Sequence, residues 1–190
     1  MKNYPHGTCS RGFTLIELLI VITIFVIVSG QVLPSLGNLV DEAHKKSAVN
    51  DLVGAINLAR STAVAESVTV TLCPIDDTGQ CTKDWRNPVT AFRDPLKARK
   101  VTDSTSVIRH LQSLSGGTWH GKTANRRYFS FNATGFAKHA IGSVLWCPND
   151  KNATKATQVI INMGGRARLA TDSNEDGIVE DASGSPVLCP

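Results

Sequence analysis

The strongest pattern in the sequence is an apolar run near the N-terminus. Over residues 13–28 the only charged side chain is Glu17, and apolar residues continue with short breaks to Leu39. A helix needs about 20 such residues to cross a bilayer, and a single strand could not satisfy its backbone hydrogen bonds in lipid. We therefore expect a membrane-crossing helix over residues 13–36.

Beyond Pro34 the pattern becomes amphipathic. Apolar residues recur mostly every three or four positions as far as Ala63, and charged or amide side chains interleave between them. This spacing is typical of a helix that packs one face against a core. We expect this second helical segment over residues 37–66, lying on a sheet.

Residues 67–190 have the pattern of strands. The stretch "SVTVTLC" places Val68, Val70 and Leu72 on one face of a strand. Further short β-type runs follow, separated by Gly, Asn and Asp clusters that favour antiparallel hairpins. The predicted fold is therefore α+β: a long N-terminal helix whose second half packs on a β-rich head of antiparallel sheet, with an acidic C-terminal tail.

The charge of the chain is unevenly distributed. The 190 residues have a net charge of +4, but residues 83–168 hold fifteen Lys or Arg against four Asp, a surplus of +11. Residues 13–82 are net acidic, and residues 169–190 hold five acidic residues and no basic one. Such a basic block either binds a polyanion such as nucleic acid, or is solvated, or pairs with acidic segments of this chain or a neighbour.

Glu17 has no neighbouring cation in the sequence, and three explanations compete for its segment. A secretory signal peptide also has a basic start, but no A-x-A-like cleavage site follows this apolar run. In a plain signal anchor the carboxylate would cost about 2.5–3.5 kcal/mol near the bilayer centre. The third explanation is cleavage between Gly12 and Phe13, which places a new α-amino group near Glu17.

The residues "GFTLIELLIVI" closely resemble the type IV prepilin signal. The resemblance implies that residues 1–12 are a leader removed after Gly12 by a prepilin peptidase, and that Phe13 becomes N-methylated. It implies that Glu17 pairs with the terminus of another pilin subunit, and that Pro34 is the family's helix proline. It also implies a type IV pilin-like fold, and insertion in the inner membrane before assembly into an extracellular pilus filament. The leader is basic with no acidic residue, so we expect a single pass with a cytoplasmic N-terminus.

Four cysteines remain when Cys9 leaves with the leader, and the setting beyond the membrane is oxidising. Four cysteines allow three pairings. We favour Cys73–Cys81, which closes the turn-rich loop "CPIDDTGQC", and Cys147–Cys189, which would pin the tail. Zinc is the rival interpretation, but the spacings fit no finger pattern and no histidine lies near these cysteines in the sequence.

A second resemblance covers most of the chain. The stretch "INLARSTAVAESVTVTLC" and a late "GRAR" resemble the GspH/FimT branch of the pilin superfamily, whose members are minor pilins or pseudopilins. In the FimT-like members that bind DNA for natural transformation, a C-terminal G-R-x-R motif is the recognition element, and Gly165, Arg166 and Arg168 match it. The resemblance implies a minor pilin that binds extracellular double-stranded DNA.

The chemistry of these residues fits phosphate contact. In a strand, Arg166 and Arg168 would project from the same face, and the glycines before them allow a tight turn that brings backbone N–H groups close to a phosphate. Further candidates are Arg126 and Arg127, expected to head a strand, with Lys122 and Lys138 nearby, and Lys97, Arg99 and Lys100. Such binding is non-specific and salt-dependent. The alternative is a structural minor pilin or type II secretion pseudopilin that primes filament assembly without binding DNA.

No catalytic site is predicted. The five histidines are scattered, and none lies in a recognisable nucleophile setting. The sequence has no GxSxG, HExxH or Walker loop. We therefore expect that the protein is not an enzyme.

The acidic tail contains a candidate metal loop. Its oxygen-bearing residues follow the first half of an EF-hand loop at positions 1, 3, 5, 7 and 9: Asp172, Asn174, Asp176, the carbonyl of Ile178, and Glu180. The turn-forming Gly177 is at position 6, but Ser183 replaces the bidentate Glu at position 12. A structural calcium ion is the only cofactor expected here. Two alternatives stay open: an acidic surface turn, and an intramolecular mask for the basic block.

Overall fold

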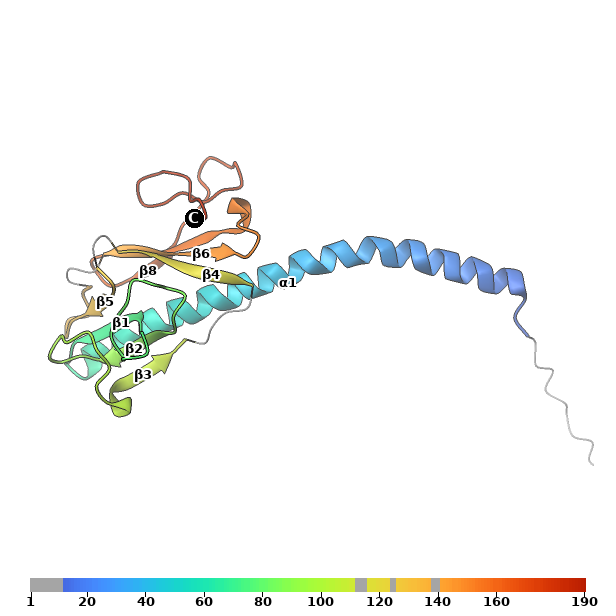
Figure 1. Ribbon diagram of the computed structural model, residues 1–190. Coiled ribbons are helices and arrows are strands. Elements are labelled where there is room, and N and C mark those ends of the chain that lie inside the picture. Colours follow the sequence, from blue (N-terminus) through green and yellow to red (C-terminus); the bar gives the residue numbers. More distant parts are fainter. Residues whose placement is uncertain (1–11, 112–115, 124–125, 138–140) are drawn as a thin grey trace, which may run out of the picture. The chain divides into compact units, whose positions relative to one another are not determined.

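The computed structural model describes residues 12–111, 116–123, 126–137 and 141–190. The leader residues 1–11, with Cys9, and Lys138 lie outside the described residues, as do the side chains of residues 31–36 and 38. The chain divides into two compact units, Met1–Val40 and Asp41–Pro190. One helix, α1 (Leu15–Ala65), contributes to both units (Figure 1).

The first unit contains the start of α1. Thr14 precedes the helix, and its Oγ1 accepts a hydrogen bond from the backbone N–H of Glu17 over 3.2 Å. This bond satisfies one of the free donors of the first turn, and Thr14 and Glu17 have the spacing of a capping box. The carboxylate of Glu17 lies in that first turn, where the helix dipole favours a negative charge. Glu17 therefore helps to start the helix, whatever its role in assembly.

The apolar side chains of residues 13–28 are all exposed. The sequence pattern predicts a membrane-crossing helix over residues 13–36. Across the residues that the structure describes, no helix is long and apolar enough to cross a membrane.

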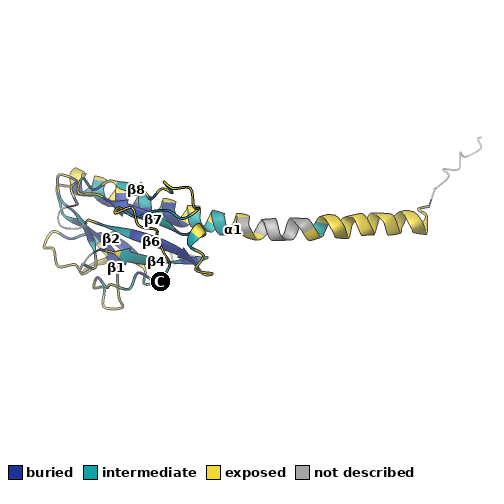
Figure 2. Cartoon of the chain, turned by 90° about the horizontal axis from the view of Figure 1, so that it is seen from above, coloured by how far each residue is buried: buried dark blue, intermediate teal, exposed yellow. Residues whose placement is uncertain are grey.

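The second unit has one main hydrophobic core, which α1 shares with two sheets (Figure 2). The helix contributes fully buried side chains that recur every three or four residues: Ala48, Leu52, Ala55, Ile56, Ala59 and Ala63. This spacing places them on one face of the helix, so the predicted amphipathic helix is confirmed. Most of its buried side chains are alanines, which let the helix backbone approach the sheets closely.

The two sheets are antiparallel and have four strands each. The first has the order β3-β2-β1-β5 and the second β4-β6-β7-β8. The strands of the first sheet are β1 (Val70–Pro74), β2 (Val89–Arg93), β3 (Val107–His110) and β5 (Phe129–Phe131). Those of the second are β4 (Gly117–Lys122), β6 (Gly142–Pro148), β7 (Thr157–Ile161) and β8 (Ala167–Leu169). The predicted α+β class is confirmed.

Two predicted strand boundaries are wrong, both at short edge strands. Arg126 does not head a strand, because its N–H donates to the carbonyl of Thr123 over 3.0 Å and its carbonyl accepts from the Thr123 hydroxyl. This local turn delays the start of β5 to Phe129. Arg166 likewise precedes β8, so only Arg168 of the pair lies in a strand.

The same five-residue turn occurs four times in the second unit, at residues 76–80, 132–136, 162–166 and 181–185. Each has Asp or Asn first and Gly fourth. The first N–H donates to the fifth carbonyl, the Gly N–H donates to the first carbonyl, and the first side chain accepts from the fifth N–H, all over 2.8–3.2 Å. The four glycines have φ between 70° and 82°, which favours a residue without a Cβ. The pattern D/N-x-x-G-x therefore suits this turn, although residues 51–55 match it within α1.

The two disulfides are Cys73–Cys81 and Cys147–Cys189, with Cα–Cα distances of 5.6 and 5.7 Å. The first closes the loop that contains the 76–80 turn. The second ties the C-terminal tail to β6, where a separate small apolar cluster forms: Leu145, Cys147, Ala156 and Val187. The favoured pairing is confirmed, and the sulfur atoms are not free to bind zinc.

Candidate nucleic-acid interface

Arg166 and Arg168, here called the edge pair, lie at the edge of the second sheet. Arg168 is in β8 opposite Ile160 of β7, and Arg166 closes the 162–166 turn two residues earlier. Both side chains are exposed. Among the described residues, neither guanidinium has an ion-pair or hydrogen-bond partner. The edge pair therefore presents two unengaged positive charges to solvent.

Gly165, the glycine of the motif, is required by the turn. Its φ is +70°, and a Cβ at this position would overlap the carbonyl oxygen of Gly135 and crowd the ring of Phe131. Its N–H donates to the carbonyl of Asn162 over 2.9 Å, so this N–H is not available to a phosphate. Gly165 positions Arg166, and the expectation that backbone N–H groups of this turn contact a phosphate stays a prediction for the N–H groups other than that of Gly165.

Four other predicted basic residues, here called the cleft residues, come together at the first sheet. Lys97, Arg99 and Arg126 line a cleft of about 510 Å³. Arg127 lines an adjoining hollow of about 310 Å³, which shares Arg99 and Arg126 with the cleft. Lys97 and Arg99 follow β2, and Arg126 and Arg127 precede β5. The strands β2 and β5 lie on either side of β1 in the sheet.

The remaining predicted basic residues lie elsewhere. Lys100 lines neither hollow and pairs through its backbone with Gln80. Lys122 is exposed at the end of β4. The edge pair also lines neither hollow. The edge pair and the cleft residues are therefore distinct groups, and Lys100 and Lys122 belong to neither.

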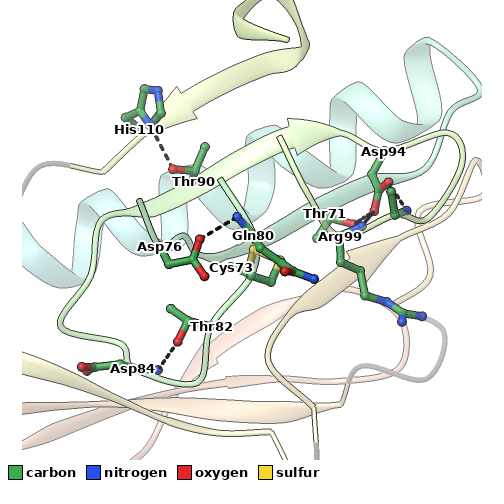
Figure 3. Close-up of a disulfide and its surroundings, with 12 residues drawn as sticks. Thr71, Cys73, Asp76, Gln80, Thr82, Asp84, Thr90, Asp94, Arg99 and His110 are labelled. Carbon is green, nitrogen blue, oxygen red and sulfur yellow. Dashed lines mark hydrogen bonds between the residues drawn. A yellow bond between two sulfur atoms is a disulfide. The ribbon is translucent and has the colours of Figure 1, made fainter. Parts of the chain in front are cut away.

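Asp94 and Tyr128 organise the cleft and were missed by the sequence analysis. Asp94 is 4% exposed. Its carboxylate accepts hydrogen bonds from the Thr71 hydroxyl and from the backbone N–H groups of Ala98 and Arg99, over 2.9, 2.7 and 3.1 Å. Figure 3 shows Asp94 turned toward Thr71 and the Arg99 backbone, with the Arg99 side chain extending away. The Asp-Pro pair after a strand is a turn signal that could have indicated Asp94.

Part of the basic block is neutralised by α1. Two carboxylates of α1 pair with bases of the block, Asp51 with Arg109 (2.9 Å) and Asp41 with Lys155 (2.8 Å), and Glu66, the residue after the helix, pairs with Arg93 (2.5 Å). The hydrogen bond from Arg93 lowers the pKa of Glu66. The hydrogen bond to Asp41, and then that to Asp150, raises the pKa of Lys155.

Within the described ranges, the acidic tail meets the basic block only through charge at a distance: hydrogen bonds from Ser183, and then the charge of Lys122, lower the pKa of Asp181. In the parts of the chain that the structure covers, no ion pair joins residues 169–190 to a basic residue. The acidic partners of the block lie on the helix and in neighbouring loops instead. The edge pair and the cleft residues are left without carboxylate partners among the described residues.

The candidate metal loop brings its carboxylates together. Oxygen atoms of Asp172, Asp176 and Glu180 lie within 4.8 Å of one another. Asp172 also accepts two backbone N–H groups of the loop, over 2.7 and 2.8 Å, and Gly177 has φ of +86°. The other predicted ligands, Asn174 and the Ile178 carbonyl, belong to the same loop. Hard oxygen donors in this order fit calcium, and calcium binding here stays a prediction.

Comparison with known proteins places the chain in a family. The family model "Type II transport protein GspH" matches residues 48–165, more than half of the chain. The prokaryotic N-terminal methylation motif matches residues 8–30. No curated protein matches the chain.

Solved structures show the same fold. Two crystal forms of the type IV minor pilin FimU of Pseudomonas aeruginosa superpose with TM-scores of 0.52 and 0.51 at 20% identity. They cover 76% of this chain and 94% and 99% of the FimU chains. With the methylation motif at its start and the GspH match over its head, the chain belongs to the GspH family and is a type IV minor pilin or pseudopilin.

Proposed function

We propose that this pilin binds extracellular double-stranded DNA without sequence preference and serves DNA uptake in natural transformation. The observation that carries the proposal is the edge pair: Arg166 and Arg168 are exposed, two residues apart, and unengaged among the described residues. A free guanidinium binds phosphate oxygens through its planar fork of donors. The G-R-x-R motif of the DNA-binding FimT-like pilins supports the same assignment.

The cleft residues and Lys100 extend this basic surface over the first sheet. Such groups reach phosphate oxygens and fix the position of a duplex, but they carry no sequence information. Binding of this kind releases counterions from the DNA, so its affinity falls steeply with salt. The proposal involves binding and no catalysis.

We also propose that the chain is processed and assembled as a pilin. Prepilin peptidase cleaves after Gly12, Phe13 becomes the N-methylated terminus, and Glu17 pairs with that terminus on a neighbouring subunit. The methylation motif supports this sequence of events. The exposed apolar side chains of residues 13–28 would be covered by other subunits in the filament. Retention of the precursor in the inner membrane, with the N-terminus in the cytoplasm, stays a prediction.

A structural role without DNA binding is the alternative. The GspH model takes its name from type II transport, and ion pairs with Glu66, Asp51 and Asp41 give three bases of the block, Arg93, Arg109 and Lys155, a structural role. Under this alternative the chain primes a filament and contacts other pilin subunits only. Neutralising the edge pair would then leave the phenotype of the filament unchanged.

The test is binding of a labelled duplex by the full chain in a non-ionic detergent. The proposal predicts that Arg166→Gln/Arg168→Gln weakens binding at low salt, about ten-fold or more. The matched control is Lys83→Gln/Lys151→Gln, which removes the same charge from two exposed lysines outside both basic groups. If both variants lose the same affinity for the duplex, net charge alone explains the effect, and the assignment of DNA binding to the edge pair is contradicted.

A further inference from the structure

The cleft at the first sheet is lined by a loop held in strained backbone. Lys97 and Arg99 have φ of 55° and 56°, a left-handed conformation that residues with a Cβ rarely adopt. The hydrogen bonds from Ala98 and Arg99 to buried Asp94 keep the loop in this form. Strained residues of this kind concentrate at sites that bind ligands. Here the strain brings two cationic side chains to one wall of the cleft.

The other cations of the cleft are also held in place. The guanidinium of Arg99 lies over the ring of Tyr128, with Cζ 4.5 Å from the ring centroid, a favourable cation–π contact. Arg126 is fixed by its backbone turn with Thr123. The cleft therefore presents Lys97 and Arg99 from a hydrogen-bonded loop and Arg126 from a backbone that is bonded to Thr123, which lowers the entropic cost of binding a ligand.

The rest of the cleft wall is polar and uncharged. Thr69 and Ser130 contribute hydroxyl groups without hydrogen-bond partners among the described residues. The Asn132 Oδ1 accepts three hydrogen bonds within its own turn, so only its NH2 group remains for a ligand. These groups suit the sugar and the base edge of a nucleotide, which offer both donors and acceptors.

The charge and the size of the cleft select a class of ligand. Its lining holds three cations and one carboxylate, Asp94, and three donors of the protein already satisfy that carboxylate. The resulting charge of +2 matches a phosphomonoester, which carries about −1.5 to −2 at pH 7, better than a phosphodiester with its single charge. A volume of about 510 Å³ suits a small ligand, and a base-paired duplex is too wide to enter it.

We infer that this cleft binds one unpaired nucleotide through its phosphomonoester. Lys97, Arg99 and Arg126 hold the phosphate, while Thr69, Ser130 and Asn132 contact the sugar and base. The nucleotide is either free or the phosphorylated end of a DNA strand. The inference sharpens the proposed function at these residues, because it assigns Lys97, Arg99 and Arg126 to a phosphomonoester instead of the diester backbone of a duplex. It rests on that function only for the strand end as a source.

Calorimetric titration of the full chain in a non-ionic detergent tests the site. The probes are thymidine 5′-monophosphate, thymidine and inorganic phosphate. We expect one site for the nucleotide, with the other two binding about ten-fold more weakly or worse, because each lacks part of the contacts. No measurable binding of the nucleotide, or binding no tighter than that of phosphate, would overturn the inference.

Variants separate this site from the edge pair. Lys97→Gln and Arg126→Gln should each weaken nucleotide binding about ten-fold, whereas Lys83→Gln and Arg166→Gln/Arg168→Gln should leave it unchanged. An equal loss in Lys83→Gln would mean that net charge alone attracts the nucleotide, and the inference would be wrong. If the edge-pair variant loses duplex binding but keeps the nucleotide, both assignments stand independently.

Competition distinguishes the two sources of the nucleotide. Single-stranded oligonucleotides with and without a 5′-phosphate are tested for displacement of a labelled nucleotide. A strand end as the ligand predicts that the phosphorylated oligonucleotide competes about ten-fold better. If neither oligonucleotide competes while the free nucleotide binds, the ligand is the free nucleotide. If both compete equally, the cleft binds the diester backbone and the inference fails.

Discussion

Gly165 lies against the carbonyl oxygen of Gly135 so closely that a Cβ at residue 165 would overlap it. The Nε of Arg60 donates a hydrogen bond to the same oxygen over 3.0 Å. The contact joins two copies of one turn, at residues 132–136 and 162–166, and the N–H of Ala137 donates to the carbonyl of Met163 beside it over 2.9 Å. The backbone that carries the edge pair is thus anchored to the first sheet and to α1.

Replacing this glycine should destabilise the head. For Gly165→Ala we expect a loss of about 2–4 kcal/mol, because the left-handed backbone costs about 1–2 kcal/mol and the overlap adds to it. Gly184→Ala is the matched control: its φ is +82° in the same kind of turn, with open space around it. Urea unfolding of the 41–190 unit, which contains its own core, measures both. Equal losses would show that the contact with Gly135 does not matter.

Asp94 should act as a positioning residue for the cleft. In Asp94→Asn an NH2 group faces N–H donors, so we expect a loss of about 1–3 kcal/mol in unfolding free energy and faster hydrogen exchange at the Ala98 and Arg99 amides. Asp77→Asn is the control, since the Asp77 carboxylate makes no hydrogen bond or ion pair among the described residues. If hydrogen exchange at the Ala98 and Arg99 amides is unchanged in Asp94→Asn, Asp94 does not position the loop of the cleft.

The pair between Glu66 and Arg93 should contribute to the pH dependence of stability. The hydrogen bond from Arg93 lowers the pKa of Glu66 below its ordinary 4.5. A lowered pKa stabilises the folded state above pH 4.5, and this contribution is lost as the pH falls through the folded-state value. Unfolding midpoints between pH 6 and pH 3 should therefore drop less for Glu66→Gln than for the wild type. In an Arg93→Gln background the same substitution should change nothing further; a continued effect there would contradict the pairing.

Calcium should raise the melting temperature if the 172–180 loop binds it. A ligand at one hundred times its dissociation constant adds about 2.7 kcal/mol of stability, and a chelator should reverse the gain. Asp176→Asn should reduce the response, while magnesium should give a smaller one because it demands a stricter geometry. A melting temperature that does not respond to millimolar calcium would remove calcium from the account.

Much of the fold follows from local patterns. The helical spacing of Leu52, Ile56 and Ala59 predicts the buried face of α1, because only one face of a helix can meet a sheet. The two disulfides also follow from the sequence, because Cys73 and Cys81 bound a short turn-rich loop and Cys189 lies in the C-terminal tail. The four D/N-x-x-G-x turns have a common sequence pattern, but residues 51–55 share it within α1, so the hydrogen bonds and not the pattern alone identify the turns.

The cleft could not be predicted in the same way. Lys97 and Arg126 are neighbours because β1 pairs with both β2 and β5, and no local pattern sets that strand order. The left-handed backbone of Lys97 and Arg99 depends on the burial of Asp94, which is a tertiary effect. The strand starts predicted at Arg126 and Arg166 are wrong for a local reason. Both residues belong to hydrogen-bonded turns that precede the strands.

The central claim is that Arg166 and Arg168 contact DNA phosphates. The most direct measurement is the slope of log affinity against log salt for a labelled duplex, compared between the full chain and Arg166→Gln/Arg168→Gln. Each phosphate contact contributes about 0.9 to that slope, so the account predicts a slope shallower by about 1.8 in the variant. Lys83→Gln/Lys151→Gln should keep the wild-type slope. Identical slopes for the wild type and the edge-pair variant would contradict the claim and favour the structural pilin.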